Sequence, residues 1–265
     1  MNHILVPVDL SQNAKEALRY AARLAAIAGA DLMIVHFHTL LQKVVSHTAG
    51  NTEISKDPEK WIQKRVAKLR KKHPDLIIDY KVIKDDILPG IQKMVEETKA
   101  DIVVMGCQGE HENIDTYLGS TSGAIVKTTE IPVMLIPPRF KFKGIDKVVF
   151  AAKNTFVRLL GTLEPIIQIN QIFKPHVQLL HLGESQDPMP DQNFTILQVI
   201  NDITRYGNDN FNESINEYLS QHHADLLCVI RRKRGFLEKL LGPARTPASK
   251  FHVELPALVL IGEDY

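Results

Sequence analysis

Glycine and hydroxyl residues gather in one stretch of the chain, residues 100–136, in an order that suits the binding of a phosphate group. They are Gly106, Gly109, Gly119, Ser120 and Thr121. An apolar run at residues 102–105 precedes them and a helical pattern at residues 121–128 follows. Glycine lets the backbone approach an anion closely, and a helix N-terminus adds unpaired N–H donors with about half a positive charge. The same spacing also suits a plain strand-to-helix connection in which the glycines only turn the chain.

A second candidate for ligand binding stands near the start of the chain. Residues 3–11 read HILVPVDLS, so that Asp9 directly follows a predicted strand at residues 3–8. This segment and the pattern Gly-x2-Gly-x9-Gly-Ser, followed by a helix and Ile-Pro-Val, resemble the two nucleotide-binding motifs of the universal stress protein family. The landmarks of this resemblance run from Asn2 to about Pro138.

The resemblance implies that this part of the chain binds ATP or a related adenine nucleotide. Asp9 would take the adenosine, the glycines would wrap the phosphates, and the hydroxyls would hold them at the helix N-terminus. The residues implied are Val8, Asp9, Phe37, Met105, Gly106, Gly109, Gly119, Ser120, Thr121 and Val133. Residues 110–115 depart from the family pattern, because their three acidic side chains would repel a bare triphosphate unless they share a divalent cation such as Mg²⁺.

The elements that must position these residues alternate along the first half of the chain. Strands are expected at residues 3–8, 32–37, 76–83, 102–105 and 133–136, and helices at residues 13–28, 57–72, 88–98 and 121–128. Strands that alternate with helices predict a parallel sheet with helices on both faces. In such sheets ligands bind outside the carboxyl ends of the strands, where both candidate motifs fall.

The second half of the chain repeats the first in a shorter form. Residues 100–105, ADIVVM, recur as residues 224–229, ADLLCV, and residues 131–136, IPVMLI, recur as residues 255–260, LPALVL. We therefore expect two α/β domains, residues 1–138 and 146–265, each with an open, mostly parallel five-stranded sheet. The resemblance implies an adenine nucleotide alpha-hydrolase-like fold, in which the final strands of the two copies pair and form a pseudo-dimer within one chain.

The second copy lacks the predicted nucleotide site. Lys153 stands where the first copy has Asp9, and Pro243 replaces Ser120, which removes a hydroxyl and an N–H donor. The glycine loop is replaced by residues 230–235, IRRKRG. The sequence therefore predicts one nucleotide site for each chain.

Several other residues admit two interpretations. His36 and His38, with His181 at the matching place in the second copy, are expected to pack or hydrogen-bond rather than to bind a metal. Cys107 is expected to be an incidental loop residue, although a loop of N–H donors could lower the pKa of its thiol. The basic cluster at 231–234 is either a solvated loop or a patch for an anion or an acidic partner.

Bulk properties limit the remaining classes. The chain has 265 residues, a net charge of +1 and two cysteines, with no apolar run near the ~20 residues that span a bilayer. We expect a cytoplasmic protein that binds neither nucleic acid nor membrane and has an unknown protein partner. No catalytic residue or metal ligand is predicted. The expected function is stress-response regulation through ATP binding; the alternatives are a slow Mg-dependent ATPase and an interaction protein without ligand.

Overall fold

The computed structural model describes residues 1–38, 57–108, 118–152, 160–182, 199–206, 211–231 and 254–262. The strands of the first half are β1 (His3–Pro7), β2 (Asp31–Phe37), β3 (Ile78–Ile83), β4 (Ile102–Gly106) and β5 (Val133–Ile136). Those of the second half are β6 (Lys147–Ala152), β7 (His176–Leu182), β8 (Asp202–Tyr206), β9 (Leu226–Arg231) and β10 (Ala257–Ile261). The helices are α1 (Gln12–Ala28), α3 (Pro58–Lys72), α4 (Ile87–Thr98), α5 (Ser120–Thr128), α6 (Leu160–Phe173) and α7 (Phe211–Gln221).

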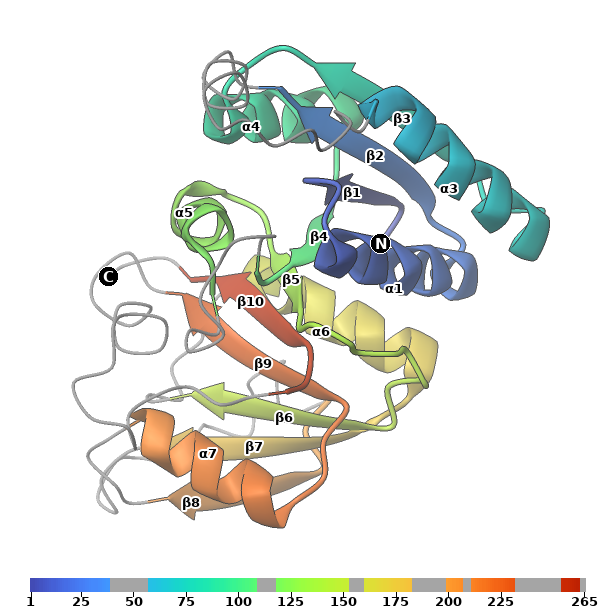
Figure 1. Cartoon of the computed structure of the whole chain (residues 1–265). Helices are drawn as coiled ribbons and strands as arrows, with labels where there is room; N and C mark the ends of the chain where they lie inside the picture. Colours follow the sequence, from blue (N-terminus) through green and yellow to red (C-terminus); the bar gives the residue numbers. More distant parts are fainter. Residues whose placement is uncertain are drawn as a thin grey trace.

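The strands form one ten-stranded sheet in the order β3-β2-β1-β4-β5-β10-β9-β6-β7-β8 (Figure 1). Every pair within a half is parallel, and the two halves have the same strand order when each is counted from its own first strand. The predicted fold, two tandem five-stranded sheets with helices, is confirmed. The predicted domain limits, 1–138 and 146–265, fall within the connection between β5 and β6 and stay a prediction.

The two halves join through their last strands, which are antiparallel. Val133 pairs with Val259, Met134 with Leu258 and Leu135 with Ala257, and all six residues are buried. An apolar strand at the edge of a sheet exposes unpaired backbone groups that invite association, and this pairing covers both edges. The expected pseudo-dimer within one chain is therefore present.

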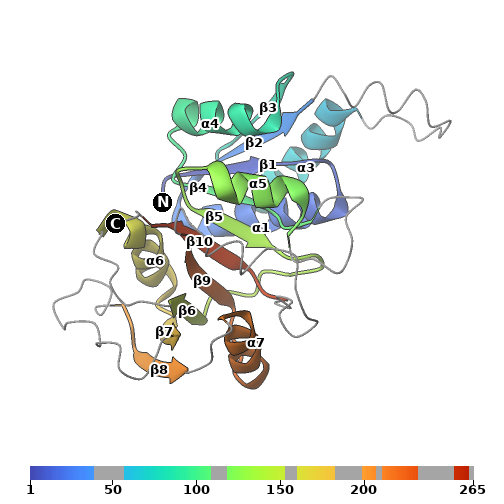
Figure 2. The same ribbon diagram turned by 90° about the vertical axis from the view of Figure 1, so that its left-hand side faces the viewer.

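Helices cover both faces of the sheet because the central strands are apolar on both sides. Alternate residues along a strand point to opposite faces, so that Ile4 and Val6 enter one apolar core and Leu5 enters the other. The first core contains residues of α1, α3 and α6, and the second contains residues of α4, α5 and α7. Figure 2 looks onto the side that carries α4 and α5.

The helix ends follow from local sequence. Ser11 caps α1 by accepting a hydrogen bond from the Ala14 N–H at 3.0 Å, and Gly29 ends the helix with φ of 69°. Asp57 caps α3 by accepting from the N–H groups of residues 59 and 60, with Pro58 at the first helical position. The two caps confirm the helix starts that were predicted at residues 13 and 57, to within one residue.

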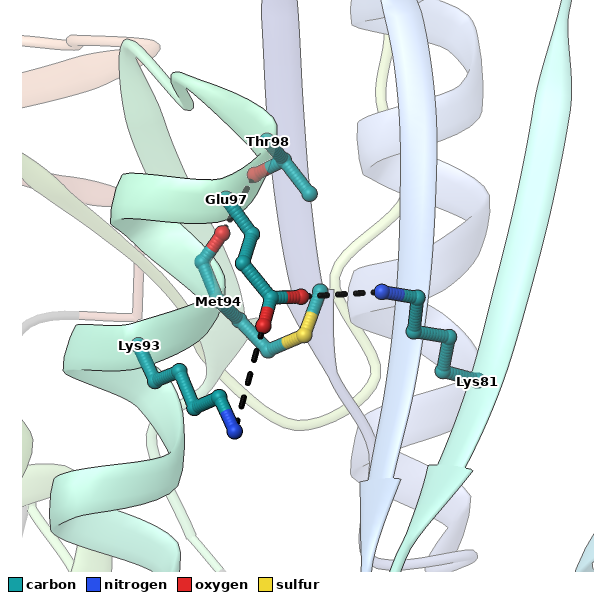
Figure 3. A network of polar contacts seen from close by, with 5 residues as sticks. All are labelled: Lys81, Lys93, Met94, Glu97 and Thr98. Atoms are coloured by element: carbon teal, nitrogen blue, oxygen red, sulfur yellow. Dashed lines mark hydrogen bonds and ion pairs between the residues drawn. The ribbon is translucent and has the colours of Figure 1, made fainter.

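The outer strand β3 is tied to α4 by an exposed charge network (Figure 3). Glu97 accepts a hydrogen bond from Lys81 Nζ at 2.9 Å and lies 4.0 Å from Lys93 Nζ. The hydrogen bond from Lys81 is the main reason that the pKa of Glu97 is lowered. A lysine on an outer strand also opposes edge-to-edge association.

Within the described part of the chain, no helix has the length and apolar character to cross a membrane.

Candidate functional site

One group, the backbone carbonyl of Cys107, holds both ends of the loop between β4 and α5. Its oxygen accepts a hydrogen bond from the Gly119 N–H at 2.7 Å and another from Ser122 Oγ at 2.7 Å. The end of β4 and the start of α5 are therefore fixed to each other. The intervening residues 109–117 include Gly109 and the acidic positions, and they lie outside the described residues.

Asn13, in the first turn of α1, ties the same loop base to β5. Its buried side chain accepts a hydrogen bond from the Gln108 N–H and donates one to the Ile136 carbonyl, each at 3.1 Å. A Cβ atom on Gly106 would lie 2.6 Å from Asn13 Oδ1. Gly106 therefore has a structural reason to be glycine besides the predicted approach of a phosphate. Sequence reasoning missed Asn13, and an amide two residues after the Ser11 cap was the available signal.

Helix α5 begins with a glycine cap, which supplies no side-chain acceptor to the first turn. Gly119 is the N-cap, with φ of −72° and ψ of 167°, and it has no side chain to accept from the first-turn amides. Ser120 and Thr121 lie in that first turn and are exposed. The N–H groups, the hydroxyls and the positive end of the helix dipole together form an arrangement that suits an anion.

Asp9 follows β1, the neighbour of β4, and its carboxylate is exposed. One of its oxygens, Oδ1, accepts a hydrogen bond from the Ser11 N–H at 3.0 Å, which orients the side chain. Leu10, between these residues, has φ of 68°, a left-handed conformation that costs roughly 1–2 kcal/mol in a residue with a Cβ. The chain thus takes an unfavourable turn where it presents Asp9 at the carboxyl edge.

His36 holds the end of β1 from the neighbouring strand. Its Nδ1 lies 2.7 Å from the Val8 carbonyl oxygen, and the Val8 N–H donates to the Val35 carbonyl at 2.8 Å. Burial lowers the pKa of His36, and the contact with Val8 opposes that shift. The predicted packing or hydrogen-bonding role is confirmed for His36. His181 is fully buried at the matching place, paired in register with Ala152 of β6.

Three of the four apolar residues predicted for the site lie at the carboxyl edge of the sheet, and the fourth does not. Val8 and Met105 are buried next to the ends of β1 and β4. Phe37 ends β2, and its ring fills the space beside Gly90 of α4, where an added Cβ would lie 2.3 Å from the ring. Val133 is not brought to this edge, because it begins β5 at the opposite end and pairs with Val103 while Ile136 reaches Gly106.

Arg231, the first residue of the predicted basic cluster, faces the interior. It ends β9, is 6% exposed, and donates to the carbonyls of Val126 and Thr129 at 2.6 and 2.8 Å. Burial lowers the pKa of Arg231, and Glu130 opposes that shift. The proposed solvated loop or partner patch is therefore wrong for Arg231, which instead binds the C-terminal end of α5 across the junction of the halves. Residues 232–234 lie outside the described part.

The thiols and histidines offer no further site in the part of the chain that the structure describes. Cys107 and Cys228 are both buried, and burial raises the pKa of Cys228. No group of three or more metal-ligating side chains occurs among the described residues. The equivalents of the site in the second half, Lys153 and Pro243, lie outside those residues, so the loss of that site stays a prediction.

In each half a doubly wound parallel sheet has the strand order 3-2-1-4-5, and in the first half a glycine-capped helix follows the fourth strand; these features define the class as tandem α/β proteins. The sequence model of the universal stress protein family matches residues 1–137, and the chain belongs to this family. It is in that sense a stress-response protein.

Solved structures share this architecture over the whole chain. A universal stress protein from Archaeoglobus fulgidus DSM 4304 is 17% identical, with a TM-score of 0.63 over 99% of this chain and 97% of that one. A functionally unknown protein from Pseudomonas aeruginosa PAO1 is 13% identical, with a TM-score of 0.64 over 99% and 93%. A putative universal stress protein from Pseudomonas aeruginosa UCBPP-PA14 is also 13% identical, with a TM-score of 0.64 over 99% and 94%. Among curated proteins, none matches the chain.

Proposed function

We propose that the first half of the chain binds ATP or a related adenine nucleotide at the carboxyl edge of β1 and β4, and that an unidentified partner protein in the cytoplasm reads its occupancy. The observation that carries this proposal is the pairing of an exposed carboxylate with a helix N-terminus that has a glycine cap and two hydroxyl side chains in its first turn. Asp9 and the start of α5 follow two strands that are neighbours in the sheet. Membership of the family supports the same assignment.

Each group has a distinct role in this proposal. Asp9 accepts hydrogen bonds from the ribose hydroxyls, because Oδ2 has no partner among the described residues while Oδ1 is held by Ser11. Ser120 and Thr121 donate to the phosphates at the positive end of α5. Asn13 and Ser122 touch no ligand, but they fix the loop base that sets the distance between the two regions.

Thermal denaturation with and without millimolar MgATP tests the proposal. A ligand that binds only the native state stabilises it by about 2.7 kcal/mol at a hundredfold excess over Kd. Asp9→Ala should weaken binding tenfold to a hundredfold, since a hydrogen bond to a charged group contributes about 1.5–3 kcal/mol.

Asp86→Ala is the matched control. Asp86 is also an exposed aspartate that follows a strand at this edge, and its side chain makes no capping hydrogen bond to α4. Nucleotide affinity should be unchanged in this variant. Absence of any shift with MgATP would favour an interaction protein without ligand, and release of phosphate after a positive shift would indicate a slow ATPase.

A further inference from the structure

Helices α1 and α3 lie on the same face of the sheet, away from α5, and each carries a row of cations. The rows are Lys15, Arg19 and Arg23 on α1, and Lys64, Lys68 and Lys72 on α3. Members of a row are four residues apart, so they lie on one side of the helix, about 6 Å from one another along its axis. Each row therefore extends about 12 Å.

The two rows face each other across a groove that holds two adjoining cavities, which we name the α1–α3 groove. The first cavity has a volume of about 230 Å³; its cationic lining is Lys15, Arg19, Lys64, Arg65 and Lys68. The second has a volume of about 570 Å³, shares Arg19 and Lys68 with the first, and extends past Arg23 and Lys72 to Arg139. Because the lining passes from Lys15 and Lys64 to Arg23 and Lys72, the rows run side by side in register.

The cations of the groove are not neutralised by the described parts of the protein. Arg19, Lys64, Lys68 and Lys72 make no ion pair with any described residue. The cavity lining contains one carboxylate, Glu16, whose oxygens accept from Gln12 Nε2 and from the Arg139 N–H. Like charges four residues apart destabilise a helix, so the repulsion within each row reduces the stability of its helix.

The positive charge of the rows contributes to lowered pKa values in neighbouring groups. Burial lowers the pKa of the Arg65 guanidinium, and the nearby charge of Arg19 lowers it further. Burial likewise lowers the pKa of His73 at the end of α3, with further contributions from Lys72 and Arg23. Several cations thus share one groove in a chain whose net charge is only +1, and an anion with several charges would relieve their repulsion.

We propose that the α1–α3 groove binds a linear inorganic oligophosphate, a chain of linked phosphate groups that lies between the two rows. Repeated cations on both walls match repeated anionic groups along one line, and Arg and Lys both bind phosphate oxygens strongly. Sites for organic ligands are mostly apolar, whereas the lining of the first cavity is cationic apart from Leu18 and Leu69, which suits phosphate groups without a large organic part.

The aromatic residues of the groove argue against a nucleic-acid strand, whose bases would need open rings for stacking. Tyr20 and Phe142 are 2% and 8% exposed. The ring of Trp61 is covered by Arg65, whose guanidinium carbon lies 3.4 Å from the ring centroid. Phe140 and His73 also line the second cavity and are half-buried, so a single-stranded nucleic acid is included as a competitor in the test below.

Titration calorimetry with sodium triphosphate and with orthophosphate tests the proposal on the whole chain. Triphosphate should bind at least tenfold more tightly than orthophosphate, and its affinity should fall as salt is raised from about 50 to 200 mM, because salt screens the charges. The double variant Lys64→Gln, Lys68→Gln should lose at least tenfold in triphosphate affinity. Its melting temperature without ligand should be unchanged or higher, since helix repulsion is reduced.

The double variant Lys71→Gln, Lys127→Gln is the matched control. It removes the same charge from exposed positions on α3 and α5 that do not line the groove, and its affinity should equal that of the wild type. Equal losses in both double variants, or equal binding of orthophosphate and triphosphate, would overturn the proposal. So would tighter binding of oligo(dT) than of a polyphosphate with the same number of phosphates. The variant Lys64→Gln, Lys68→Gln changes no residue of the proposed nucleotide site, so its loss of triphosphate affinity would assign the binding to the groove rather than to the start of α5.

Discussion

At the residue scale, the base of the β4–α5 loop is held by side chains bonded to backbone groups. The side chains of Asn13 and Ser122 reach backbone carbonyl and N–H groups at the ends of β4 and β5. Such contacts join residues about 15 to 123 positions apart, so a sequence pattern cannot show them. The residues are visible in the sequence but their hydrogen-bond partners are not, which is why Asn13 was missed.

Gly106→Ala should destabilise the protein because the new Cβ meets Asn13 Oδ1 at 2.6 Å. Forcing a methyl group into a packed site costs about 1–3 kcal/mol. Gly123→Ala in α5 is the control, since a Cβ there meets nothing within 4 Å and alanine stabilises a helix by about 0.5–1 kcal/mol. Urea denaturation measures both changes.

The same strain should be relieved in the double variant Asn13→Ala, Gly106→Ala. Because the two residues are in contact, their effects on the free energy of unfolding should be non-additive by more than about 0.5 kcal/mol. Strict additivity would show that the contact with Asn13 is not what requires glycine at position 106.

His36 should make stability depend on pH near neutrality. Its folded pKa is lowered mainly by burial, so the unfolded state binds more protons between the folded value and the ordinary value of about 6.5. Stability is therefore fully present above about pH 7 and is lost as the pH falls through 6.5 toward the folded pKa. His36→Gln should flatten this part of the curve of unfolding free energy against pH. An unchanged slope in that variant would contradict the assignment.

At the element scale, the sequence predicted the strands and helices of the first half well because their periodicity and caps are local. Errors fall at element ends, where a tertiary contact decides. The strand expected from residue 76 begins at Ile78, because the Leu76 N–H donates to the His73 carbonyl in a turn. The family resemblance implied that Val133 lies in the site, but the register of β5 puts it at the opposite end of the sheet.

Arg231 connects one element of each half, and its replacement should weaken that connection. Its guanidinium donates to the last carbonyls of α5, from more than 100 positions along the chain. Hydrogen bonds to charged groups contribute about 1.5–3 kcal/mol each, so Arg231→Met should lower the free energy of unfolding by roughly 3 kcal/mol. Amide hydrogen exchange should accelerate in the last turn of α5.

Lys127→Met is the comparison for that variant. Lys127 is an exposed cation in the last turn of the same helix, and its loss should change stability by no more than about 0.5 kcal/mol. If both variants were equally stable, Arg231 would have no structural role at the junction of the halves.

At the scale of the whole molecule, the total charge of the chain does not show how its cations are distributed. The net charge of +1 gives no hint of the cationic α1–α3 groove, because acidic residues elsewhere balance the sum. The family resemblance implied that the final strands of the two copies pair within one chain, and the structure shows that β5 and β10 do so in an antiparallel direction. The junction makes one sheet of two halves that carry different residues at their carboxyl edges.

That difference predicts one nucleotide per chain. The first half presents Asp9 after β1 and the glycine-capped start of α5 after β4, whereas Ile230 and buried Arg231 end β9, the counterpart of β4 in the second half. Lys153 stands where Asp9 would be, and an ammonium group cannot accept hydrogen bonds from a ribose. Calorimetric titration should therefore end at one equivalent, and Lys153→Ala should leave the affinity unchanged. Saturation at two equivalents, or a large loss in the Lys153→Ala variant, would show that the second half binds nucleotide as well.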